Sequence, residues 1–515
     1  MKISKLLLTI ILAATAAFQP AFSQSANTLA IEPSATPVPY NRMIFGQFIE
    51  HFHRQIYGGI FEPGSPLADK DGFRTDVVEA LRELQIPIVR WPGGCFVSSY
   101  HWLDGVGQTR QPAYDKAWGV EDPNTFGTAE FVHWCRLIGA EPFICTNAGT
   151  GTAEEMSDWV EYCNLNVGKY AQIRKSQGIA EPLNVKYWSV GNENWGGHEI
   201  GAKTVAEWGP FVRESAKMMV SVDPTIKLFA AATADENWTL PLLQAAGHLL
   251  DYVSIHGYWD GLHQANNPSP YIECMMRTEQ PAGDIASTIA ILEKANLRGR
   301  VKIAFDEWNL RGWHHPTFPG GRGDKSRIAD RNKNDINSTY TMADAVFSAC
   351  FLNTCLRNCK DVEIGGFSPV VNTRGALFVY PKGIVRRTTF YVLKMYASLL
   401  EKNVLPTETI CEKLEHNGKS TPVLDAIVTC DDAQKRYVIA VANKHPEKSV
   451  SFDVQTVTGA KIKQLKATVL SGSSPDDYND VGAETRVIPE SKLLKVDKGT
   501  VLLPPHSVVF IEANS

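Results

Sequence analysis

The feature that most constrains the fold is a regular alternation of apolar, strand-like segments with amphipathic helical patterns. We count eight such segments: Met43–Glu50, Ile86–Trp91, Glu141–Asn147, Val185–Glu193, Ile226–Ala232, Asp251–Tyr258, Val301–Glu307 and Val362–Val370. Helical patterns lie between them, for example Arg74–Leu84, Thr128–Ile138, Thr204–Val222, Asp284–Ala295 and Met342–Leu356, with a last one at Val385–Leu400. This alternation predicts an α/β fold, a (β/α)₈ TIM barrel over residues 43–400. A doubly wound open sheet is the alternative, but no Gly-x-Gly-x-x-Gly follows the first segment.

The sequence changes character after residue 400. Short runs of alternating apolar residues are separated by Gly, Pro, Asn and Asp, at Leu424–Thr429, Tyr437–Ala442, Val450–Val454, Leu465–Leu470, Val501–Leu503 and Val508–Ile511. This spacing is typical of an antiparallel β-sandwich, which we place at residues 401–515. Residues 24–42 contain one strand-like piece, Thr28–Ile31, which we expect to join the sandwich.

Residues 1–23 have the pattern of a signal peptide. Lys2 and Lys5 precede an apolar run, Leu6–Phe18, and small residues follow near Ser23. We therefore expect export to the periplasm or the extracellular space. No other run is long and apolar enough to span a bilayer.

Charge and cysteine content exclude some functions. The 515-residue chain carries 51 basic and 56 acidic residues, a net charge of −5, without a basic run, which argues against nucleic acid as the partner. A neutral substrate fits this balance. Several of the ten cysteines lie inside apolar segments, so we expect buried thiols, with a disulfide between Cys411 and Cys430 left open.

Polar and aromatic residues gather where the predicted strands end. They are Glu50 and His51, Arg90 and Trp91, Asn147, Asn192 and Glu193, His256, Tyr258 and Trp259, and Glu307 and Trp308. Each one alone has a structural explanation, such as an ion pair or a buried histidine. Functional residues of such barrels lie at the carboxyl ends of the strands, so six polar tips at one mouth predict a binding or catalytic site.

Two of these tips carry the carboxyl groups that glycosidic bond cleavage requires. One carboxylic acid protonates the leaving oxygen, and one carboxylate meets the developing oxocarbenium ion. Glu193 and Glu307 are the expected pair, with Glu50 as a third carboxylate nearby. We expect the charge of Glu307 to raise the pKa of Glu193. Tryptophans are candidate sugar platforms, namely Trp91, Trp118, Trp195, Trp259 and Trp308, although each alone is more often a core residue.

Several motifs, in this order, resemble one family of glycosidases. They are Phe45–His51, Tyr57–Ile60, Arg90–Gly94, Asp104–Gly107, Asn147–Gly151, Gly191–Glu193, Ser254–Tyr258 and Asp306–Asn309. Together they resemble the α-L-arabinofuranosidases of glycoside hydrolase family 51, over about residues 44–400 and more weakly beyond. The resemblance implies a retaining, exo-acting enzyme that releases terminal arabinofuranosyl groups from arabinan or arabinoxylan of the plant cell wall. It implies no metal and no cofactor, and relatives form trimers or hexamers, so a homo-oligomer is one option.

The resemblance also implies roles for individual residues. Glu193 would be the general acid/base and Glu307 the nucleophile. Substrate-binding residues would be Glu50, Arg90, Cys95, Trp118, Asn147, Asn192, His256 and Tyr258. Among them, Arg90 and Tyr258 would also position the nucleophile, His256 would support its hydrogen bonds, and Trp118 would line the entrance.

Three stretches depart from the family pattern or extend it. Asn194–Gly197 replaces the usual residues after the acid/base, so the leaving-group side is expected to differ. A sugar-contacting Gln beyond the eighth strand has no match, and Asn372 or Arg374 would substitute for it. The insertion at residues 312–334 is expected to form a rim of the cleft, with His314 and His315 as ordinary loop histidines.

Two other functions stay open from the sequence. An endo-β-1,4-glucanase or xylanase of the same family would share the catalytic residues but have a longer cleft. A non-catalytic polysaccharide-binding protein would bind sugars without turnover.

Overall fold

The computed structural model describes residues 27–31, 36–262, 267–312, 333, 335–458 and 462–514. The predicted signal peptide, most of the predicted rim insertion, and His314 and His315 lie outside these residues. None of the described helices has the length and apolar character needed to cross a membrane.

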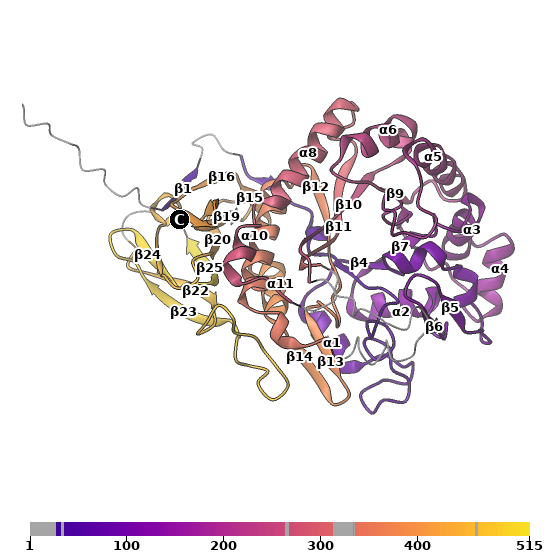
Figure 1. Cartoon of the computed structure of the whole chain (residues 1–515), viewed down its shortest axis with the longest axis horizontal. Helices are drawn as coiled ribbons and strands as arrows, with labels where there is room; N and C mark the ends of the chain where they lie inside the picture. The colour runs from indigo at the N-terminus through magenta and orange to yellow at the C-terminus, as the bar shows by residue number, and fades with distance from the viewer. Residues whose placement is uncertain are drawn as a thin grey trace, which may run out of the picture.

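A closed barrel of eight parallel strands forms the larger part of the chain (Figure 1). Its strands are β3 (Gln47–Phe48), β4 (Ile88–Trp91), β7 (Glu141–Thr146), β8 (Tyr187–Val190), β9 (Lys227–Ala231), β10 (Tyr252–Asp260), β11 (Lys302–Arg311) and β12 (Val362–Phe367). Helices surround it: α1 (Thr75–Glu83), α2 (Thr128–Ile138), α3 (Ala153–Asn164), α4 (Lys169–Ser176), α5 (Val205–Val222), α6 (Glu236–Ala246), α7 (Tyr271–Met275), α8 (Gln280–Lys294), α10 (Met342–Arg357) and α11 (Thr388–Leu399). The predicted TIM barrel is confirmed.

Alternation along the strands builds the barrel interior in layers. An apolar layer includes Ile88, Phe143, Tyr187, Phe229, Tyr252, Ala304 and Ile364. Residues two positions further along the same strands include Arg90, Cys145, Ser254 and Asp306. The barrel is therefore filled with apolar side chains below and lined with polar ones at its carboxyl end.

Two local predictions about the barrel were wrong. The segment Met43–Glu50 is mostly not strand, because η1 (Arg42–Phe45) precedes the two-residue strand β3. The last helix begins at Thr388 rather than Val385, because Gly383–Arg386 forms strand β14, which pairs with β13 (Leu377–Tyr380). A second hairpin that was not predicted pairs β5 (Ala113–Asp115) with β6 (Val120–Asp122).

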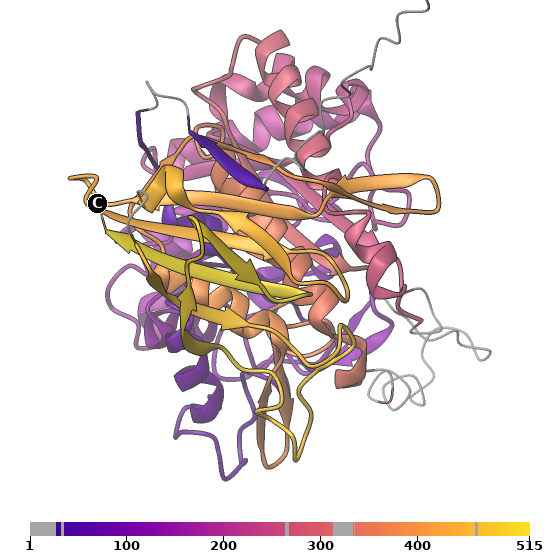
Figure 2. The ribbon, with the colours of Figure 1, turned by 90° about the vertical axis from the view of Figure 1, so that its left-hand side faces the viewer.

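The C-terminal part consists of antiparallel sheets, as predicted (Figure 2). The larger sheet contains β2 (Val38–Pro39), β15 (Asn403–Leu405), β19 (Leu424–Cys430), β20 (Arg436–Asn443), β25 (Ser507–Asn514), β22 (Gln464–Leu470) and β23 (Glu490–Lys495). The smaller contains β16 (Thr407–Ile410), β1 (Thr28–Ile31), β21 (Val450–Asp453) and β24 (Thr500–Leu503). The remaining elements are the hairpin β17 (Lys413–His416) and β18 (Lys419–Pro422), and α12 (Gln455–Thr458). Strand β1 pairs with β16 and β21, so the N-terminal piece lies within this region.

The sandwich packs against barrel helices α10 and α11 (Figure 1). Tyr396 of α11 meets Phe510 of β25 with ring centroids 5.0 Å apart. Asp425 of β19 accepts hydrogen bonds from Arg357 and Asn353 of α10. All ten cysteines lie in the described residues and all are free thiols, so the disulfide alternative was wrong.

Candidate active site

A cavity of about 400 Å³ opens at the carboxyl end of the barrel. Its lining residues are Glu50, Gly94, Cys95, Lys116, Ala117, Trp118, Asn192, Glu193, His198, Ile200, Tyr258, Glu307 and Arg374. Most of the predicted site residues therefore meet in one place. The volume is near the lower end of the range typical of small-molecule sites.

Strand β11 delivers Glu307 through a local irregularity. Phe305 pairs with Gly365 and Trp308 with Phe367, so β11 has one more residue than β12 in this interval. Such a bulge re-aims a side chain. Asp306 and Glu307 both contact Arg90, whereas Trp308 packs in the outer core against Phe351.

Two groups position the Glu307 carboxylate. Arg90 Nη1 lies 2.5 Å from Oε1, and the Tyr258 hydroxyl donates to Oε2 at 2.7 Å. Arg90 is itself fixed by Asp306, 3.1 Å away, and donates to Asn192 Oδ1 at 2.8 Å. The predicted positioning of the candidate nucleophile by Arg90 and Tyr258 therefore has direct contacts behind it.

Glu193 follows β8 on a tight turn. Gly191 has φ +74°, and a Cβ there would lie 2.0 Å from Asn194 Oδ1, so the turn requires glycine. Glu193 itself has φ +43°, a left-handed conformation that is strained for a side chain of this size. The turn directs the carboxyl group toward the cavity.

Two histidines contact the two oxygens of Glu193. His256 Nδ1 lies 2.8 Å from Oε1, and His198 Nε2 lies 2.8 Å from Oε2. Burial raises the pKa of Glu193, but the hydrogen bonds from His198 and His256 outweigh it and hold the pKa well below its usual range. The expectation that Glu307 raises the pKa of Glu193 was therefore wrong, because the two imidazoles dominate.

The role expected for His256 also needs correction. Its close contact is with Glu193, and Glu307 Oε1 is further away, at 3.7 Å. Burial lowers the pKa of His256, but the charge of Glu307 and hydrogen bonds with Asp306 and Glu193 raise it to about 10. His256 is thus a buried imidazolium that bridges the two candidate catalytic groups.

Glu50 is a neutral carboxylic acid at neutral pH. Burial and the nearby charge of Glu307 raise its pKa to about 8. Its Oε1 accepts hydrogen bonds from Phe96 N and from Trp118 Nε1, at 3.0 and 3.1 Å. A Cβ on Gly93 would lie 2.3 Å from Glu50 Cγ, so only glycine allows this approach.

Other predicted residues have different surroundings. Asn147 does not line the cavity, because its amide oxygen accepts from Gly149 N and Thr150 N in its own loop and its Nδ2 donates to Tyr100 O in the segment after β4. Trp91, Trp259 and Trp308 are packed against other aromatic rings of the core. Of the five tryptophan candidates, Trp118 lines the cavity and Trp195 is 39% exposed nearby.

Asn372 and Arg374, the two candidates for the sugar contact beyond the eighth strand, have different surroundings. Arg374 lines the cavity with its guanidinium 4.4 Å from the Tyr258 ring centroid. Asn372 is buried, and its amide bonds Arg54 O and Val379 N. Arg374 is therefore the residue that reaches the site.

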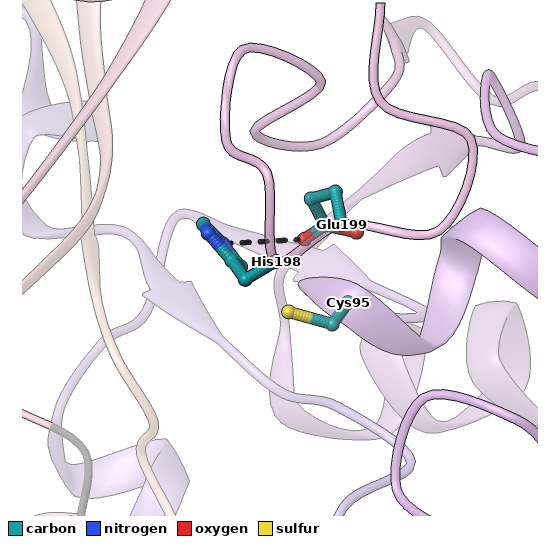
Figure 3. A group of neighbouring side chains, drawn as sticks. All are labelled: Cys95, His198 and Glu199. Carbon is teal, nitrogen blue, oxygen red and sulfur yellow. Dashed lines mark ion pairs between the residues drawn. The ribbon is translucent and has the colours of Figure 1, made fainter.

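The loop after β8 brings two residues that sequence reasoning missed, His198 and Glu199. Glu199 accepts hydrogen bonds from Asn192 at 2.7 Å and Ser98 at 2.7 Å, and burial raises its pKa. Figure 3 shows His198 facing Glu199, with Cys95 beside them. Burial and the charge of Glu199 raise the pKa of the Cys95 thiol well above its usual value, so it stays protonated.

Two groups of side chains among the described residues have metal-like spacing: Cys95, His198 and Glu199, and Glu193, His256 and Glu307. The donor atoms within each group lie within 4.8 Å of one another. Hydrogen bonds among these side chains and their neighbours account for both groups without an ion. The second group also places carboxylate oxygens of Glu193 and Glu307 within 4.8 Å.

A parallel eight-stranded barrel with paired carboxyl groups at its carboxyl-end mouth defines the class, a barrel glycoside hydrolase. Two family models match the chain: the α-L-arabinofuranosidase 1 domain over residues 80–277 and the α-L-arabinofuranosidase C-terminal domain over residues 306–507.

Full-length relatives agree with these family matches. The probable α-L-arabinofuranosidase C of Aspergillus clavatus is 33% identical, over 95% of this chain and 97% of its own. The intracellular exo-α-(1→5)-L-arabinofuranosidase of Halalkalibacterium halodurans is 33% identical over 84% of this chain and 88% of its own. The arabinose complex of the Thermotoga maritima α-L-arabinofuranosidase superposes with a TM-score of 0.83 at 32% identity, covering 95% of this chain and 100% of that one. The chain belongs to the α-L-arabinofuranosidases of glycoside hydrolase family 51.

Proposed function

We propose that this α-L-arabinofuranosidase removes terminal arabinofuranosyl groups by a two-step retaining mechanism, with Glu307 as nucleophile and Glu193 as acid/base. The observation that carries the proposal is the distance of at most 4.8 Å between carboxylate oxygens of the two residues. Retaining enzymes hold their carboxyl groups about 5–5.5 Å apart, whereas inverting enzymes leave about 6.5–9.5 Å for a water molecule.

In the first step, a Glu307 oxygen bonds to the anomeric carbon while the bond to the leaving oxygen breaks. Glu193 gives its proton to that oxygen, which leaves as an alcohol. In the second step, water attacks the same carbon, its proton passes to Glu193, and the bond to Glu307 breaks. Arg90 and Tyr258 hold the Glu307 carboxylate for attack.

The neutral Glu50 acid suits recognition of an uncharged sugar. A carboxylic acid both donates and accepts a hydrogen bond, so it can pair with a furanose hydroxyl without placing a third negative charge beside Glu307. Trp118 holds one of its oxygens and faces the cavity, where its ring can cover a C–H face of the sugar.

The natural substrate proposed is a branched or linear arabinose-containing polysaccharide of the plant cell wall, attacked at chain ends. Support comes from the name of the Halalkalibacterium halodurans relative, an exo-α-(1→5)-arabinofuranosidase, and from the small size of the cavity, about 400 Å³. Comparison of linear arabinan, arabinoxylan, unsubstituted xylan and a β-1,4-glucan as substrates tests this. Shortening of the last two polymers would favour the endo-acting alternative.

The mechanism has a direct test. Hydrolysis of 4-nitrophenyl α-L-arabinofuranoside followed by NMR in the first seconds is expected to release the α-anomer, and methanol is expected to give the α-methyl glycoside. Release of the β-anomer would contradict retention.

Export remains part of the proposal. It is supported by Lys2, Lys5 and the apolar run Leu6–Phe18. Amino-terminal sequencing of protein secreted by a host cell is expected to begin near Gln24, and an uncleaved chain would contradict it.

A further inference from the structure

The acid/base Glu193 has an unusual partner at the solvent side of the cavity. His198 comes from the loop after β8, and its side chain is 51% exposed. Its Nε2 lies 2.8 Å from Glu193 Oε2. The same atom lies 3.9 Å from Glu199 Oε1, a pair that Figure 3 marks with a dashed line. The other partner of Glu193, His256, is 5% exposed and fixed from below by Asp306 and Ser254.

This arrangement leaves a question about the proton. A general acid must be protonated when substrate binds, yet the hydrogen bonds from His198 and His256 outweigh burial and lower the pKa of Glu193. The hydrogen bond with Glu193 raises the pKa of His198. In the unliganded site the proton that Glu193 needs therefore lies on the imidazole, 2.8 Å from the carboxylate.

We propose that His198 is a positioning residue that stores the catalytic proton and returns it to Glu193 when a sugar covers the cavity. The inference rests on the proposed function, because it takes Glu193 as the acid/base. The two histidines then have different roles: buried His256 orients Glu193, and exposed His198 exchanges the proton with solvent.

Substrate binding drives transfer of the proton from His198 to Glu193. A bound substrate removes water from the imidazolium–carboxylate pair, and loss of water favours the neutral pair over the charged one. The proton moves from His198 Nε2 to Glu193 Oε2, and Glu193 then passes it to the leaving oxygen as Glu307 bonds to the anomeric carbon. In the second step the proton of the attacking water goes to Glu193 and back to His198.

Three carboxylates near His198 oppose its deprotonation in the free enzyme. Glu193 and Glu199 come from its own loop, and Glu307 faces it from β11. The remaining titratable groups of the cavity are Glu50, Cys95, Lys116, Tyr258 and Arg374, with His256 behind Glu193. Cys95, Tyr258 and Glu50 are uncharged at neutral pH. Lys116, Arg374 and the His256 imidazolium carry positive charge, but the three carboxylates outweigh them, and the pKa of His198 is raised.

The test is His198→Gln, since a Gln amide can replace the Nε2 donor but cannot carry the proton. Its kcat/KM for an alkyl arabinofuranoside, a poor leaving group, is expected to lose its alkaline limb at least one pH unit earlier than wild type. At pH 7 the loss is expected to be about tenfold or more, and for 2,4-dinitrophenyl arabinofuranoside, which needs no acid, less than about threefold. Imidazole added to His198→Gly is expected to restore the alkyl activity.

A matched control is His101→Gln. His101 is 46% exposed and pairs with Glu155 at 2.9 Å, outside the residues that line the cavity, so this substitution is expected to leave both profiles unchanged. An unchanged alkaline limb in His198→Gln, or equal losses on both substrates, would overturn the inference.

A measurement without turnover separates the inference from the proposed function. In ¹³C-carboxyl NMR titrations the pKa of Glu193 is expected to rise in His198→Gln and to stay unchanged in His101→Gln. If the wild type hydrolyses no arabinofuranoside, the proposed function fails. If the pKa of Glu193 is the same in His198→Gln as in wild type, the pairing of His198 with Glu193 is refuted.

Discussion

The barrel mouth and the barrel–sandwich interface both bury charged groups, but they treat them differently. At the interface, Asp425 accepts two hydrogen bonds from Arg357, at 2.8 and 2.9 Å, and a third from Asn353. Lys444, fully buried, bonds Thr278, Thr421 and Glu279 at 2.7–3.1 Å. Asp425 and Lys444 thus each have several hydrogen-bond partners within the protein.

At the mouth, carboxyl groups are gathered around a cavity. Asp306 and Glu307 share Arg90, while Glu50 is kept protonated by burial and by the charge of Glu307. The interface charges are therefore expected to serve stability, whereas the mouth charges are held for a ligand at a cost to stability. Substitutions at the two places are therefore expected to separate activity from stability.

The largest expected effect on this comparison comes from Glu307→Gln. Loss of the nucleophile is expected to lower kcat by about 10⁴-fold or more, because the covalent intermediate cannot form. The melting temperature is expected to be unchanged or higher, since one of the crowded carboxylates is removed. Initial rates and thermal unfolding check both parts, and substantial residual activity would refute the nucleophile assignment.

Glu193→Ala is expected to have a smaller and substrate-dependent effect. Hydrolysis of arabino-oligosaccharides is expected to fall about 10²–10⁴-fold, whereas aryl arabinofuranosides with good leaving groups lose less. Azide is expected to accelerate turnover of the aryl substrate and give an arabinosyl azide, because it replaces water without needing a base. An equal loss on all substrates and no azide product would argue that Glu193 is not the acid/base.

At the interface, Asp425→Asn is expected to destabilise without changing the site. Arg357 would lose its buried counter-charge, so the free energy of unfolding is expected to drop by about 3 kcal/mol, with kcat unchanged. Asp432→Asn is the control, because the Lys402–Asp432 pair is 77% and 72% exposed, and a change of less than about 0.5 kcal/mol is expected. Denaturant unfolding measures both, and a loss of kcat in folded Asp425→Asn would remove the distinction between the regions.

The sequence predicted the barrel well because the periodicity of apolar residues marks each strand and helix without reference to distant parts of the chain. Runs such as Tyr187–Val190 and helices such as Thr128–Ile138 are marked by periodicity, and all eight strands lie within the predicted segments or within a few residues of them. The same alternation could have placed one tryptophan, since Arg90 points into the barrel and the next residue, Trp91, must face the helices.

Other parts of the site depend on contacts that periodicity does not encode. Both Asp306 and Glu307 reach Arg90 because of the irregular pairing of β11 with β12, which depends on the partner strand. His198 reaches Glu193 through a turn built on Gly191 and the left-handed Glu193. The motif Asn192-Glu193 pointed to the proposed acid/base, but nothing in the local pattern of Asn194–Glu199 indicates that His198 contacts Glu193.

The smallest expected effect is a pH dependence of stability with opposite signs in the two regions. The pKa of Glu50 is about 8 in the folded chain and about 4.3 in an unfolded one. Its preference for the protonated form therefore stabilises the fold fully below pH 4, and this contribution is lost as the pH rises toward 8. Glu50→Gln lacks this titration, so relative to wild type its free energy of unfolding is expected to rise as the pH increases from 5 to 8.

Asp425 is expected to behave in the reverse way. Burial raises its pKa, but Arg357 outweighs burial and holds the pKa below its usual value. The stabilisation is thus present above about pH 4 and is lost as the pH falls through the folded-state pKa. The free energy of unfolding of wild type is therefore expected to exceed that of Asp425→Asn by less in acid than at neutral pH. Relative to Glu50→Gln, the free energy of unfolding of wild type is expected to fall as the pH rises toward 8. Urea unfolding of the three proteins from pH 3 to pH 8 measures both trends, and parallel curves would show that the mouth and the interface hold their charges alike.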